Sequence, residues 1–81
     1  MINTTYYANV TPSHPRSDPA GLFRRIHTEP LPIDESLHRD LRWHRTEALY
    51  LNQLGYADFD YVEITESEAE IIIDRWTQKW R

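Results

Sequence analysis

The stretch DYVEITESEAE, residues 60–70, decides the fold of this chain. Residues 60–64 are rich in strand-forming side chains, and Thr65 follows them with Glu68 three positions later. In such a capping box the Thr65 hydroxyl accepts from the Glu68 amide, and the Glu68 carboxylate accepts from the Thr65 amide. The stretch therefore predicts a strand that passes directly into a helix ending near Trp80.

The predicted C-terminal helix carries one apolar stripe at helical spacing, formed by Ala69, Ile72, Ile73, Trp76 and Trp80. Acids in its first turn and basic side chains near its end, including Arg81, agree with the helix dipole. We expect this stripe to pack on a sheet. Trp76 is expected in the core, whereas Trp80 is expected either there or against a partner.

Two strand-like runs, residues 6–10 and 22–27, precede this helix. Residues 11–21 lie between them and contain Pro12, Pro15 and Pro19 among polar side chains, a composition typical of a loop. The two runs therefore predict a hairpin with a long, mobile tip, and whether that loop orders on binding is left open.

The middle of the chain predicts short helices. Asp34 is a credible N-cap for a helix over residues 35–43, in which Leu37 and Leu41 share one face. A second helix is expected to begin at Thr46 and to end at Gly55, which suits a left-handed position after a helix. The two are either separate or one kinked helix.

These elements predict a single α+β domain over residues 1–81. We expect a small three-stranded antiparallel sheet, a hairpin plus one strand, packed by the C-terminal helix. One or two short helices lie between the second and third strands. A right-handed crossover places the third strand beside the first, in the order 2-1-3, and the order 1-2-3 is the alternative.

The composition limits the kinds of site that the protein can have and the cellular compartment in which we expect it. The 81 residues contain no cysteine, which excludes disulfides and thiolate metal sites. No basic and apolar leader begins the chain, and no apolar run approaches the ~20 residues that span a bilayer. We therefore expect a cytoplasmic protein without a membrane partner.

Neither metal binding nor catalysis is predicted. The helix expected over residues 35–43 would place His38 and His44 on different faces, and His14 and His27 lie elsewhere. Asp58, Asp60 and Glu63 lack the spacing of a calcium loop. The serines sit where hydroxyl groups normally cap helices or turns. We expect no cofactor and no enzymatic activity. The remaining enzyme interpretation requires an oligomer with an active site between subunits.

Several segments resemble a family of small uncharacterised proteins of actinobacterial type. The resemblance covers about three quarters of the chain and rests on residues 21–25, 40–43, 47–51, 60–65 and 68–69. It implies a cytoplasmic bacterial setting. No activity is attached to the family, so the resemblance assigns no site.

The charge distribution suggests a binding surface. The net charge of −4 divides into about +1 up to Arg45 and about −5 from Thr46 onward. Aromatic residues and arginine carry much of the energy of interfaces. We therefore predict a non-enzymatic interaction or regulatory module, whose partner is a protein of unknown identity or a second copy. Its predicted binding residues are Phe23, Arg24, Arg25, Arg39, Arg42, Trp43 and Arg45.

Two other interpretations use the same arginines. A small nucleic-acid-associated regulator would contact phosphates with them, although the acidic second half opposes this. A structural role would pair them, within one chain or between subunits, with the acids on one face of the last helix. Those acids are Glu66, Glu70 and Asp74.

Overall fold

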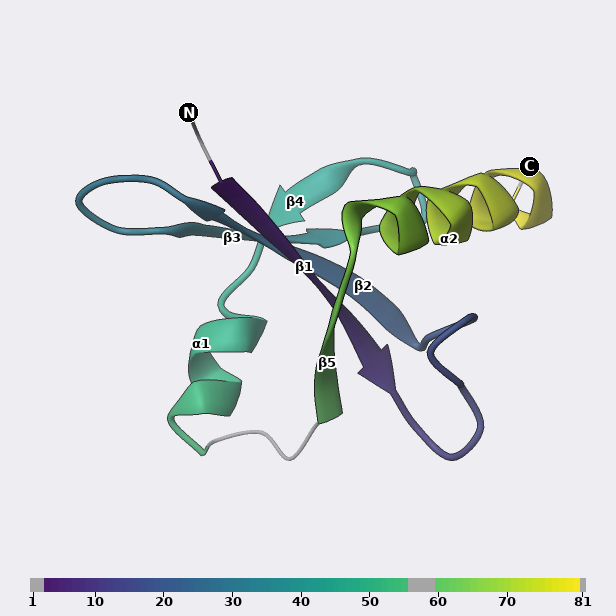
Figure 1. The fold of residues 1–81 in the computed structure, drawn as a ribbon, viewed down its shortest axis with the longest axis horizontal. Coiled ribbons are helices and arrows are strands. Elements are labelled where there is room, and N and C mark those ends of the chain that lie inside the picture. Colours follow the sequence, from purple (N-terminus) through teal and green to yellow (C-terminus); the bar gives the residue numbers. More distant parts are fainter. Residues whose placement is uncertain (1–2, 56–59, 81) are drawn as a thin grey trace.

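The computed structural model describes residues 3–55 and 60–80, which form an antiparallel sheet with two helices (Figure 1). The elements in chain order are β1 (Asn3–Val10), β2 (Gly21–His27), β3 (Ile33–Leu37), β4 (Trp43–Arg45), α1 (Ala48–Gln53), β5 (Asp60–Ile64) and α2 (Glu66–Lys79). Within these residues the sheet has five strands in the order β4-β3-β2-β1-β5. The α+β class and the C-terminal helix are as predicted.

The order of the three predicted strands is confirmed. β1 and β2 form the expected hairpin, and β5 pairs with the other side of β1. This is the order 2-1-3, and the alternative 1-2-3 is wrong. The expected number of strands is also wrong, because β3 and β4 extend the sheet beyond β2.

The helix predicted over residues 35–43 is instead the hairpin of β3 and β4. At its turn, the Leu41 amide donates to the His38 carbonyl at 2.9 Å, and Leu41 takes a left-handed φ of 64°. Asp34 caps no helix, because its carboxylate accepts from Arg25 on the neighbouring strand β2. The ion pairs with β2 need extended backbone on both sides, so they favour the sheet over a local helix.

The second short helix is confirmed as α1, separate from the β3–β4 hairpin. It begins at Ala48 rather than Thr46, and the Thr46 hydroxyl accepts from the Ala48 amide at 3.1 Å. Gly55 follows it with φ 85°, the left-handed conformation that a glycine adopts without strain.

α2 begins as its sequence predicts. The Thr65 hydroxyl accepts from the Glu68 amide at 3.1 Å, and the Glu68 carboxylate accepts from the Thr65 amide at 3.0 Å. Ala69, Ile72 and Trp76 are buried, while Ile73 and Trp80 are partly buried against the same cluster. The apolar stripe therefore faces the sheet. In the described parts of the chain, neither helix is long and apolar enough to cross a membrane.

The two faces of the sheet are covered differently. On one face α2 packs over a cluster to which the strands contribute Ala8, Leu22, Leu37 and Ile64. The register places Arg25 on the opposite face, where its guanidinium lies 3.4 Å from the Gln53 side chain of α1. The sheet thus carries α2 on one face and α1, with buried Leu49, on the other.

The loop between β1 and β2 is fastened to α2. Arg16 binds the Glu68 carboxylate with two hydrogen bonds, and Arg75 donates to the Ser17 carbonyl at 2.8 Å. The Trp76 indole donates to Asp18 at 3.1 Å. These contacts join segments more than fifty residues apart in sequence and hold the loop beside the helix.

Candidate functional site

The seven predicted binding residues do not form one surface. Phe23 and Arg25 lie on the α1 face of the sheet, whereas the register places Arg24 and Trp43 on the α2 face. Arg39 and Arg42 lie in the turn between β3 and β4, and Arg45 ends β4. The predicted surface combined the second strand with a helix from Glu35 to Arg45. Because β3 and β4 form a hairpin there instead, the seven side chains are divided between the two faces of the sheet and the turn.

The fold brings Arg24 and Trp43 into contact as part of the packing of the sheet. The Arg24 Nε donates to the Glu35 carboxylate at 2.7 Å, and its guanidinium carbon lies 4.3 Å from the Trp43 ring centroid. The Tyr6 ring also lies beside Trp43, with the two ring centroids 6.2 Å apart. Trp43 is therefore half-buried at the margin of the core.

Phe23 packs against another aromatic side chain of the sheet. A Cβ at Gly21 would lie 2.9 Å from the Phe23 ring, so only glycine lets this ring lie across β2. The ring then meets Tyr61 edge-on at 4.9 Å, over the intervening strand β1. The pair ties β2 to β5 on the face that α2 leaves open.

Arg25 forms the most enclosed ion pair among the described residues. Its Nε and Nη2 donate to the two Asp34 carboxylate oxygens at 2.7 and 3.0 Å, and the two side chains are only 14% and 10% exposed. The hydrogen bonds to Asp34 raise the pKa of Arg25 above its ordinary value. The partner is thus an acid of the neighbouring strand and not one of the predicted acids of the last helix.

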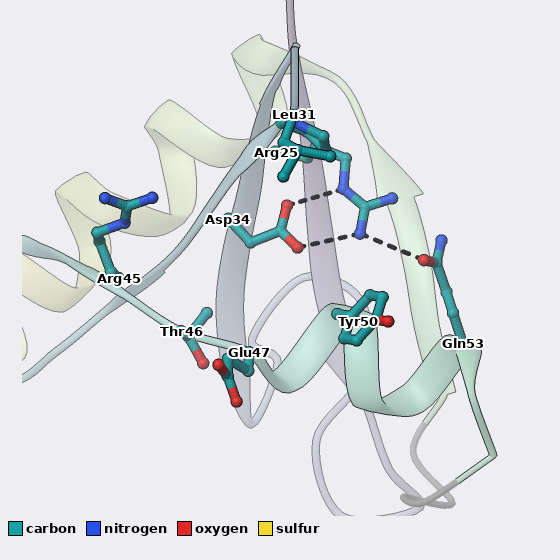
Figure 2. A pocket seen from close by; sticks show the side chains of 9 residues that line it. Arg25, Leu31, Asp34, Arg45, Thr46, Glu47, Tyr50 and Gln53 are labelled. Carbon is teal, nitrogen blue, oxygen red and sulfur yellow. Dashed lines mark hydrogen bonds and ion pairs between the residues drawn. The ribbon is translucent and has the colours of Figure 1, made fainter. Parts of the chain in front are cut away.

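A groove lies directly above this ion pair, between α1 and the β2–β3 end of the sheet (Figure 2). Its volume is about 810 Å³. The residues that line it are Arg25, Leu31, Pro32, Asp34, Arg45, Thr46, Glu47, Tyr50 and Gln53. Figure 2 shows Tyr50 and Gln53 on α1 facing the paired side chains of Arg25 and Asp34. This size falls within the range of ordinary ligand and side-chain pockets.

Two large apolar side chains that line the groove are exposed. Leu31 is 74% exposed and Tyr50 is 55% exposed, while Leu54 just beyond α1 is 52% exposed. Leu51 is also exposed, but neither Leu51 nor Leu54 lines the groove. α1 buries Leu49 on the sheet and turns the other large side chains outward. The groove is hard to predict from the sequence, and Leu31 between two prolines is its one local signal.

The β3–β4 hairpin gathers a second polar group that the predicted helix would have separated. His38 and His44 stack with ring centroids 4.2 Å apart. His38 Nε2 lies 3.0 Å from the Ser36 hydroxyl, and His44 Nε2 lies 2.8 Å from the Asp40 carboxylate. The hydrogen bond to His44, together with one from the Arg42 amide, lowers the pKa of Asp40.

This group is not arranged for nucleophilic catalysis. The histidine that contacts Ser36 is not the one that contacts Asp40, so no carboxylate orients the base beside the hydroxyl. Among residues 3–55 and 60–80, no three histidine or acidic side chains are placed to hold a metal ion. Of the acids considered for calcium, Asp60 and Glu63 lie on β5, and Asp58 lies outside the described residues, as does Arg81.

Comparison of the chain with known protein families, with curated proteins and with solved structures finds no match.

Proposed function

We propose that this chain is a non-enzymatic protein-binding module, and that the groove beside α1 receives an apolar segment of a partner protein. One observation carries the proposal: Leu31 of the β2–β3 loop and Tyr50 of α1 are large, exposed apolar side chains that line the same concave site. Exposed apolar patches of this kind, rimmed by polar groups, typically mark interaction sites.

The floor of the groove supports an apolar occupant. Arg25 and Asp34 already satisfy each other with two hydrogen bonds, so covering them leaves no unpaired charge. The Thr46 hydroxyl is likewise engaged, because it accepts from the Ala48 amide. A partner side chain that covers this floor therefore gains contact with Leu31 and Tyr50 without leaving Arg25 or Asp34 unpaired.

The charged side chains at the rim of the groove favour one orientation of a bound partner. Arg45 and Glu47 carry opposite charges and both line the groove, and both residues are exposed. Charges in such positions contribute mainly to the rate and register of association rather than to affinity. A partner with an apolar anchor flanked by charges of both signs suits this rim.

The test is a pull-down from the native host with the intact chain as bait. Replacing Leu31 and Tyr50 together by Ser is expected to abolish capture, because buried apolar anchors dominate the energy of such contacts. Ile71 is the matched control, since it is 61% exposed on α2 and lies outside the groove. Ile71→Ser is expected to leave capture unchanged.

Thermal melts separate binding from folding in the same experiment. Exposed substitutions of this kind ordinarily change stability by no more than about 0.5 kcal/mol, so all variants should melt alike. Capture that survives the Leu31 and Tyr50 substitutions, or that Ile71→Ser removes equally, would exclude the groove as the binding surface.

A further inference from the structure

A second hollow lies where three distant segments meet, and its volume is about 300 Å³. It is lined from the β1–β2 loop by His14 and Asp18, from the β3–β4 turn by Arg39, and from the end of α2 by Trp76, Lys79 and Trp80. It shares no lining residue with the groove beside α1. The two sites can therefore be tested independently.

The walls of this hollow are held in place by the fold. The Trp76 indole donates to Asp18, which seats the loop on the helix. Trp80 stacks on Trp76 with ring centroids 4.8 Å apart, and the Arg39 guanidinium carbon lies 5.5 Å from the Trp80 ring centroid. A cation held against an aromatic ring is positioned without the use of a carboxylate.

The charge of the lining is predominantly basic. Arg39 and Lys79 have no carboxylate at ion-pair distance anywhere in residues 3–55 and 60–80. His14 binds the Thr11 hydroxyl through Nδ1 at 3.0 Å, so its Nε2 stays free of that bond. Asp18 is the one acid among the described lining residues, and one of its oxygens already accepts from the indole.

We propose that this hollow binds an oxyanion the size of a phosphoryl group, with Arg39, Lys79 and His14 as its donors. Hydrogen bonds from charged donors to phosphate oxygens are short and strong, and a guanidinium offers two in parallel. The source of the group is inorganic phosphate or a phosphomonoester. The carbonyl end of α2 carries partial negative charge, which Lys79 offsets, so millimolar affinity is expected.

The test is a titration of the intact protein followed by two-dimensional NMR, first with inorganic phosphate and then with phosphoserine. Ionic strength is matched throughout with chloride. The Nε1–H signals of Trp76 and Trp80 report from inside the hollow. We expect saturable shifts confined to these signals and to the amides of the three lining segments. Shifts with both probes assign a phosphomonoester site, and shifts with phosphate alone assign a free-anion site.

Variants decide whether the named donors are responsible. Arg39→Gln and Lys79→Gln, made separately, should each weaken binding by about tenfold or more, which corresponds to one charge-assisted hydrogen bond. Arg42→Gln is the matched control, because Arg42 is exposed in the same turn but does not line the hollow. Shifts that do not saturate, that chloride reproduces, or that Arg42→Gln reduces equally would overturn the proposal. Lys79→Gln stays informative if Arg39→Gln disturbs Trp80.

Discussion

Replacing Trp76 by Phe tests how the β1–β2 loop is joined to α2. Trp76 is 3% exposed, and its indole nitrogen donates to Asp18 at 3.1 Å. Phe keeps an aromatic ring in the core but removes this donor. A hydrogen bond to a charged acceptor contributes about 1.5–3 kcal/mol, and partly exposed Asp18 places the expected loss near the lower value. Urea denaturation followed by circular dichroism measures the change.

Two further variants complete the measurement. Trp76→Ala should cost more, about 3–5 kcal/mol, because the core loses a whole ring. Asp18→Ala combined with Trp76→Phe should cost less than the sum of the two single changes, with a coupling energy of about 0.5–3 kcal/mol. Strict additivity, or a neutral Trp76→Phe, would refute the idea that this bond fastens the loop.

Two other predictions concern the start of α2. Thr65→Ala should cost about 0.5–2 kcal/mol in chemical denaturation through loss of the cap, whereas exposed Ser67→Ala should cost less than about 0.5 kcal/mol; equal losses would contradict the capping box. The Arg16 hydrogen bond lowers the pKa of Glu68 to about 2 from its ordinary 4.5, so the stabilisation is present above pH 4.5 and is lost as the pH falls toward 2. A carboxyl NMR titration should show the Glu68 midpoint rising in Arg16→Gln, and an unchanged midpoint would speak against this cause.

The parts of the fold that the sequence predicts are those encoded locally. The capping box and the stripe around Trp76 lie within one segment, so spacing alone predicts α2. The crossover rule then places β5 beside β1, because the connection from the hairpin to the last strand has a preferred hand.

The sequence does not predict β3 and β4, because the contacts that favour these strands are not local. Glu35 faces the α2 side of the sheet between Ile33 and Leu37, which obscures the alternation of a strand. The Glu35 carboxylate forms an ion pair there with Arg24 on β2, and the Asp34 carboxylate forms one with Arg25. The β3–β4 turn also has no recognisable sequence signal, since Leu41 takes a left-handed conformation that is usual for glycine or asparagine.

The same limit applies to the groove. Leu31 and Tyr50 are nineteen positions apart, and only the sheet brings the β2–β3 loop beside α1. Of the predicted arginines, only Arg24 and Arg25 form ion pairs among the described residues, and neither pairs with an acid of the last helix. Both pair with acids that the sequence assigned to a helix.

The fastening of the β1–β2 loop to α2 has a consequence for synthesis of the chain. Asp18 and Trp76 are 58 positions apart, and the apolar face of the first hairpin is covered by the same helix. At ~5–20 residues per second, a ribosome leaves that face uncovered for roughly 3 to 12 seconds. During this interval Leu22 has no helix to pack against, so the apolar face of the nascent hairpin stays exposed until α2 is made.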